Sequence, residues 1–397
     1  MPPRALIYLK DIFIIAITSF GGPQGHLAVM HNILVKKRRY FTEEELLAAN
    51  GLCQMLPGPA STQTIIVLSQ KKGGVLLAIL SLIVWIIPAS ALMSVLVLLF
   101  SMFETRNMPT DFLIFIQPAA IGIIAHAGFS MGMKLIKNRT GVYILMLSVM
   151  IALSVTTPWT FPLILIGAAG ITNITNRMEI VPEQQVQPQV NWKNTYLSLG
   201  IFFGLFIIIG ALAVVTRNRP FILFENFFRF GTLTFGGGSV LVPMMFEQFV
   251  KHHAYISATD FLSGLAINQA MPGPSFAFAA FTGGMALKGM GATFQFAGCL
   301  IGIIAIFLPG ALMAFMIYPF WEHMKNFAFI KKSLEGINAA SVGLVLAAAI
   351  ILYTNLEFRW INLAVVLTAF LLLEFTKIKA PYLVVLALLS GIVYSYL

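Results

Sequence analysis

Long runs of apolar residues alternate with short polar segments along most of the chain. From residue 73 onward these runs recur at about the length, roughly 20 residues, that an α-helix needs to cross a bilayer. The first 72 residues differ, because their apolar segments are shorter and are interrupted by glycine and proline. The pattern predicts an all-α, polytopic membrane protein in which the first segments are broken helices.

Two kinds of break interrupt the apolar pattern, and each occurs twice. F-G-G stands at 20–22 and 235–237, and P-G-P stands at 57–59 and 272–274. The segments beside the breaks in the first half are about 11 to 16 residues long, which is roughly 16–24 Å of helix and short of the ~30 Å hydrocarbon core. Two such segments can join into one kinked span, or fold back as a re-entrant hairpin.

The chain contains an internal repeat. A shift of 215 residues superimposes both kinds of break without a gap and matches Tyr40 with Tyr255 and Gln54 with Gln269. Beyond the P-G-P motifs the match continues with a further shift of about six residues. We expect a first repeat, a polar linker, an apolar helix without a counterpart, and a second repeat, at 1–175, 176–195, 196–216 and 217–397.

Positive charge indicates the orientation of these segments. The basic clusters at 36–39 and 71–72 flank the first P-G-P motif, and both should be cytoplasmic, which a re-entrant hairpin allows and a single span does not. The unpaired helix then starts the second half outside, so the repeats have inverted topology. In the second half the positions that match K-K-R-R read K-H-H-A, at 251–254. Three arginines fall on the wrong side of this arrangement, namely Arg217, Arg219 and Arg359.

The breaks predict a substrate site. Non-helical backbone at membrane depth occurs only where it is buried in protein or lines a watery cavity, and broken helices in inverted repeats point to a transporter site near the midplane. A helix that restarts after P-G-P offers free N–H groups and its positive dipole end to an anion. The candidate substrate-binding residues are Gly21, Gly22, His26, Gln54, Pro57, Gly58, Pro59, Ser61, Thr62, Arg229, Gly236, Gly237, Ser239, Gln269, Pro272, Gly273, Pro274 and Ser275.

Each polar candidate also has a structural interpretation. Serine, threonine and glutamine can satisfy the backbone of a turn, and His26 can donate to an anion, carry a proton or simply pack. Arg229 is a candidate counter-charge, since intramembrane charges are functional by default, or it snorkels from a helix end. Glu225 and Glu247 are candidate partners or proton carriers, and His126 has a structural interpretation.

Composition excludes several other functions. Only 10% of the residues are charged and 58% are hydrophobic, and the net charge of +10 lies in short clusters between apolar runs. Nothing therefore suggests a soluble basic domain for nucleic acid. No His/Cys/Asp/Glu cluster has metal-ligand spacing, no phosphate-binding loop is present, and no cofactor is expected. An intramembrane enzyme would need a nucleophile with a base or a carboxylate pair, and none recurs in both halves.

The sequence resembles the chromate ion transporter family in its long, two-domain form. The resemblance covers essentially the whole chain and rests on F-G-G-P-x-x-H, K-K-R-R-Y-F-T-E-E-E, L-C-Q-M-L-P-G-P-A-S-T-Q, F-G-G-G-S-V-L-V-P and Q-A-M-P-G-P-S-F-A-F-A-A, at 20–26, 36–45, 52–63, 235–243 and 269–280. Members of the family often carry an acidic residue after the first F-G-G-P, where this chain reads M-H-N-I-L-V at 30–35.

The resemblance implies a multi-pass protein of the cytoplasmic membrane that exports chromate and confers chromate resistance, as an antiporter or through another ion gradient, with sulfate as a mimic of the dianion. Composition and spacing alone indicate a secondary transporter for an anion. A transporter for sulfate or another small anion and an anion channel remain as alternatives. The oligomeric state is open, a homo-oligomer included.

Overall fold

The computed structural model describes residues 3–20, 22–54, 56–105, 111–155, 160–175, 192–234, 238–318 and 328–395. Within these ranges every regular element is a helix. Four helices are long and apolar enough to cross a membrane, and they span Ala60–Met102, Tyr196–Thr216, Ala292–Ile317 and Lys332–Thr354. The chain is therefore a polytopic membrane protein.

The first half begins with short helices on either side of the breaks and continues into longer ones. Its elements are α1 (Pro3–Thr18), α2 (Gly22–Met30), the π-helix η1 (His31–Lys37), α3 (Glu43–Gln54), α4 (Ala60–Thr105), the short η2 (Asp111–Leu113), α5 (Ile116–Leu135), α6 (Arg139–Ser154) and α7 (Thr160–Thr175). Helix α4 bends at Gly73 and Gly74, and Gly74 has a φ of 78° that a glycine adopts without strain.

The second half follows α8 (Trp192–Thr216), which begins four residues before the predicted start of the unpaired helix. It starts with the same order of elements as the first half and is divided further where the first half has α4. Its elements are α9 (Arg219–Leu233), α10 (Gly238–Met245), the π-helix η3 (Phe246–His252), α11 (Ala258–Ala270), η4 (Ser275–Ala277), α12 (Phe278–Ala286), η5 (Lys288–Met290), α13 (Ala292–Ile317), α15 (Ala328–Thr354), α16 (Trp360–Phe375) and α17 (Ala380–Ser395).

Backbone details recur at the predicted offset. The π-helices η1 and η3 lie 215 residues apart. Arg39 and Ala254, with φ values of 52° and 50°, are separated by the same offset, and so are Gly58 and Gly273, with φ values of 111° and 99°. Residues other than glycine rarely adopt a positive φ. The match between Arg39 and Ala254 is therefore a shared unusual backbone conformation, and not only shared helical content.

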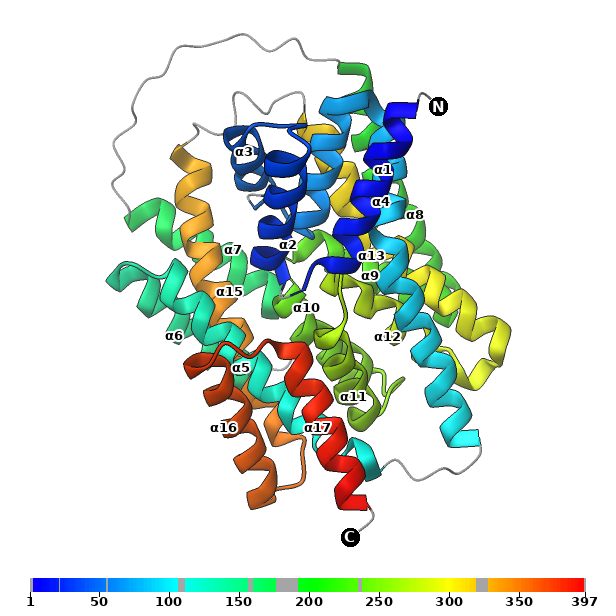
Figure 1. Cartoon of the computed structure of the whole chain (residues 1–397), viewed down its shortest axis with the longest axis vertical. Helices are drawn as coiled ribbons and strands as arrows, with labels where there is room; N and C mark the ends of the chain where they lie inside the picture. The colour runs from blue at the N-terminus through cyan, green and yellow to red at the C-terminus, as the bar shows by residue number, and fades with distance from the viewer. Residues whose placement is uncertain are drawn as a thin grey trace.

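The helices form two packed groups (Figure 1). In one group α15 packs against α5, α6 and α7, and α5 also contacts α16 and α17. In the other group α13 packs against α4, α8, α9 and α12, and α1 packs against α4. Gly283 and Gly298 allow α12 and α13 to pack closely, because a Cβ on either residue would lie 2.3 Å from the other's carbonyl oxygen.

The broken segments lie between and beside these groups. Figure 1 shows α2 and α3 in the upper part of the view, α11 in the lower part, and α10 below α2 near the middle of the molecule. The breaks of the two halves therefore approach each other from opposite ends of the structure.

Candidate functional site

The first P-G-P motif lies at the tip of a chain reversal. Near the start of α3, Glu45 accepts a hydrogen bond from Lys71 of α4 over 2.7 Å. The two segments that flank the motif therefore begin and end on the same side. Thr42 and Glu45 cap each other's backbone amides at 2.8 and 3.1 Å, which forms a capping box at the start of α3. Lys71 and the Thr42 amide lower the pKa of the Glu45 carboxyl.

The tips of the two P-G-P motifs bond to the opposite halves of the chain. The Gly58 amide donates to the carbonyl of Thr234 over 2.7 Å, and the Gly273 amide donates to the carbonyl of Ser19 over 2.8 Å. Ser19 and Thr234 each stand directly before an F-G-G motif. Each P-G-P break is thus joined to the F-G-G break of the other half.

The same glycines pack against long helices of the opposite half. A Cβ on Gly58 would lie 3.1 Å from the Cα of Gly310, and a Cβ on Gly273 would lie 3.0 Å from the Cβ of Ala89. Both contacted residues directly follow the proline inside a long helix. In addition, Gln63 donates to the carbonyls of Pro57 and Gly310, at 2.8 and 3.2 Å. The breaks are held together by backbone and amide contacts.

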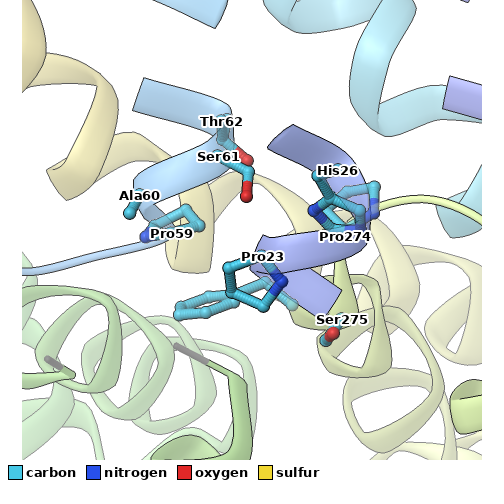
Figure 2. Close-up of a pocket in the computed structure, with 9 residues that line it drawn as sticks. Pro23, His26, Pro59, Ala60, Ser61, Thr62, Pro274 and Ser275 are labelled. Atoms are coloured by element: carbon cyan, nitrogen blue, oxygen red, sulfur yellow. The ribbon is translucent and has the colours of Figure 1, made fainter. Parts of the chain in front are cut away.

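A small pocket lies where the breaks meet (Figure 2). It is lined by Pro23, His26, Pro59, Ala60, Ser61, Thr62, Pro274, Ser275 and Phe276. These residues come from three of the four breaks; the fourth, at 235–237, lies outside the described residues. In this conformation the pocket has room for about one water, which is less space than a tetrahedral oxyanion fills.

His26 contributes a buried imidazole to the pocket, with the Gly273 backbone as a nearby polar group. The side chain is 3% exposed, and neither ring nitrogen has a hydrogen-bond partner of good geometry among the described residues. Its ring meets the Trp85 ring edge-on, with 5.3 Å between centroids, and Trp85 Nε1 donates to Thr62 Oγ1 over 3.0 Å. Trp85 thus touches two of the pocket's polar residues.

Trp85 is not among the residues predicted from the sequence. A signal was present, because a tryptophan buried in an apolar helix usually finds a partner for its indole N–H, and hydroxyl residues follow the nearby P-G-P motif. The partner itself depends on how α4 bends back beside its own first turns, which the sequence pattern does not specify.

The pocket is chemically asymmetric although the chain repeats. The residues that stand 215 positions after His26, Ser61 and Thr62 are Leu241, Phe276 and Ala277. The imidazole and two of the hydroxyls therefore come from the first half. The second half supplies Ser275 and the backbone around Pro274.

Several predicted residues lie elsewhere. Gln54 is exposed and Gln269 is half-buried, and neither lines the pocket. Arg229 is buried and donates to Glu225 and Asn226 at 2.8 and 2.5 Å. The tip residues Pro57, Gly58, Pro272 and Gly273 shape the turns without lining the pocket, and Gly22 starts α2 with a φ of 69°. Gly21, Gly236, Gly237 and the side chain of Ser239 lie outside the described residues.

Two further ionisable residues have charged partners outside the pocket. Glu247 pairs with Lys251 of the same π-helix at 2.9 Å, and His126 of α5 lies 3.3 Å from Glu374 of α16. Among the described residues, no group of three or more His, Cys, Asp or Glu side chains is placed to hold a metal ion.

The fold defines a polytopic, all-helical membrane protein whose broken helices meet inside it. The chain belongs to the chromate transporter family, whose model matches residues 7–174 and again residues 221–392.

Three curated relatives match nearly the whole chain. An uncharacterized transporter of Methanocaldococcus jannaschii is 23% identical, over 98% of this chain and 94% of its own length. A probable chromate transport protein of Synechococcus elongatus is 24% identical, over 99% and 96%. A chromate transport protein of Cupriavidus metallidurans is 24% identical, over 94% and 89%. No solved structure matches the chain at a significant level.

Proposed function

We propose that this chain is a secondary transporter that moves chromate, as a tetrahedral oxyanion, out of the cytoplasm across the cell membrane. Two of the relatives bear the name of chromate transport proteins, and the shared family supports the same substrate class here. The observation that carries the proposal is the pocket in which the first F-G-G break and both P-G-P breaks come together.

Backbone donors and hydroxyls at the pocket suit an oxyanion. Helix α4 starts at Ala60, and the next two residues place their hydroxyls in the pocket. The first N–H groups of a helix have no partner within it and carry the positive end of its dipole. A dianion leaves water only where several such donors replace its hydration, so selectivity rests on how many of them converge.

The two halves act as inverted repeats in this proposal. One family model matches both halves, and the first four elements of each half recur in the same order. Contacts between loops fit the orientation expected from charge. Asn138, beside the basic α5–α6 loop, donates to Glu335 near the start of α15, and Asn173 at the end of α7 donates to Ser333 over 2.7 Å. Both contacts join helix ends near basic residues, such as Lys137 and Arg139 in the first half and Lys331 and Lys332 in the second, which the positive-inside rule assigns to the cytoplasm.

Packing of the two P-G-P segments is unequal, which supports alternating access. Helix α11 packs against α5 and α17. The corresponding helix α3 makes no comparable contact with α15 or α7 within the described residues. Leu47 of α3 is 50% exposed, and its counterpart Leu262 of α11 is 0% exposed. We infer that this conformation is open on the side of α3, the cytoplasmic side, and closed on the side of α11.

Transport into inverted membrane vesicles tests the proposal. Cells expressing the chain yield vesicles whose cytoplasmic face is outward, and we expect them to take up chromate in response to an imposed proton or ion gradient. Thr62→Val removes a pocket hydroxyl and should reduce uptake at least about tenfold, whereas Thr293→Val, at an exposed position at the start of α13, should not. Folded, inserted protein that ignores chromate in every gradient contradicts the proposal.

Two alternatives have distinct outcomes in the same assay. If sulfate is transported and chromate neither moves nor competes, the chain is a transporter for a different anion of the same geometry. If the purified protein in planar bilayers passes anion currents far above carrier turnover, it is a channel that uses the same helix dipoles.

A further inference from the structure

Among the described residues that line the pocket, His26 is the only titratable one. It lies in the short helix α2 after the first F-G-G break, faces the hydroxyls at the start of α4, and is buried without a hydrogen-bond partner of good geometry. A buried polar group that lacks a partner costs about 1–3 kcal/mol. Such a group at a ligand pocket is explained when the ligand supplies the missing partner.

Ionisable groups on the neighbouring elements are engaged away from the pocket. On α1, Asp11 accepts from Arg38 at 2.9 Å and from Tyr40 at 2.8 Å, and Tyr8 bonds with Ser69 at 3.1 Å. On η1, His31 pairs with Glu43 at 3.5 Å; on α4, Lys71 pairs with Glu45 and Lys72 lies over the Tyr40 ring. The remaining cations of these elements are exposed, namely Arg4, Lys10, Lys36 and Lys37. On the opposite wall, η4 and α12 carry no ionisable residue.

We propose that His26 takes up a proton when the oxyanion binds, so that one proton and one dianion occupy the pocket together. This inference rests on the proposed function. The geometry supplies the reason. An imidazolium buried without a counter-charge is unfavourable, and so is a dianion held only by neutral donors. When both are present, a charge-assisted hydrogen bond between the imidazolium and the dianion offsets the free-energy cost of burying each charge.

The proton comes from water on the open side and is held on a ring nitrogen until the anion leaves. It then crosses with the anion, so each dianion moves with a single net negative charge, and an inside-negative membrane potential favours its exit. Trp85 acts as a positioning residue, because one side chain fixes both the imidazole plane and the Thr62 hydroxyl.

Other intramembrane ionisable residues are less suited to this role. Glu247 has Lys251 at 2.9 Å, and Arg229 has Glu225 at 2.8 Å. Each of these residues therefore already has an ion-pair partner, unlike His26. Neither pair lines the pocket.

Calorimetric titration of the purified protein with sulfate, between about pH 5.5 and 8.5, tests the inference. Sulfate is chosen because it stays a dianion over this range, whereas chromate takes up a proton of its own. Repeating the titration in two buffers of different ionisation enthalpy counts the protons bound. We expect about one proton per sulfate at the upper end of the range, where the Kd rises about tenfold per pH unit.

Three variants locate the proton. His26→Gln should bind sulfate more weakly, with no proton uptake and a Kd independent of pH. His252→Gln makes the same substitution at an exposed position outside the pocket and should keep the wild-type pH dependence. Trp85→Phe retains an aromatic ring but loses the donor to Thr62; it should weaken binding severalfold and preserve the proton count.

The outcomes separate this inference from the proposed function. If the wild-type protein binds sulfate or chromate without proton uptake, the function stands and the inference is wrong, whatever the folding state of the variants. If proton uptake persists in His26→Gln, the inference is also wrong, because another group carries the proton. If the wild-type protein binds neither anion at any pH, the proposed function fails and the inference fails with it.

Discussion

The backbone amide of Gly58 donates to the carbonyl of Thr234 over 2.7 Å. The two residues are far apart in the sequence and belong to different halves of the chain. The bond has a counterpart between Gly273 and Ser19 at 2.8 Å. Each half therefore completes the break of the other, and the pocket exists only when both halves are folded together.

We expect Gly58→Ala and Gly273→Ala to destabilise the protein and abolish transport. Both glycines have a positive φ, which costs another residue roughly 1–2 kcal/mol, and a new Cβ would lie 3.1 or 3.0 Å from the opposite half. Thermal unfolding monitored by size-exclusion chromatography measures the loss.

Gly51→Ala is the matched control for these substitutions. Gly51 lies inside α3, and a Cβ there has no neighbour within 4 Å. Alanine should leave stability unchanged or raise it by about 0.5–1 kcal/mol. Equal loss of stability at all three positions would contradict the role given to the crossing bonds.

The unequal exposure of α3 and α11 predicts one-sided accessibility. Single cysteines at Leu47→Cys and Leu262→Cys occupy equivalent repeat positions, one 50% and the other 0% exposed. A membrane-impermeant maleimide added from the cytoplasmic side should label the first and spare the second. The two native cysteines are buried, so their background is low. Labelling of both positions at the same rate would contradict a conformation open on one side.

Part of this architecture can be predicted from the sequence. The glycine and proline breaks, their 215-residue offset and the helices between them follow from local chemistry, since glycine and proline act on the backbone where they stand. The partners of Gly58 and Trp85 do not, because they depend on how distant segments cross. Leu47 and Leu262 are the same residue at matching repeat positions, so no pattern in the sequence predicts that the first is exposed and the second buried.

The Glu45–Lys71 contact predicts a small, pH-dependent stabilisation of the first hairpin. Glu45→Gln should lower the free energy of unfolding by about 0.2–1 kcal/mol at neutral pH and low salt. Because Lys71 lowers the pKa of Glu45 from its ordinary value of 4.5, the contribution is present above that value and is lost as the pH falls through the folded-state pKa. Thermal unfolding at several pH values measures it. Glu44→Gln, an exposed neighbour on the same turn, should show no such dependence.

The paired glutamines Gln54 and Gln269 test which residues bind the anion. Gln54 and Gln269 stand one turn before the two P-G-P motifs, which makes them candidate donors, but neither lines the pocket in this conformation. We therefore expect Gln54→Ala and Gln269→Ala to weaken sulfate binding less than Thr62→Val does, since the hydroxyl already faces the pocket. Calorimetry on the three variants under one condition gives the order of their sulfate affinities. If a glutamine variant loses as much affinity as Thr62→Val, the breaks rearrange on binding far enough to bring that amide to the ion.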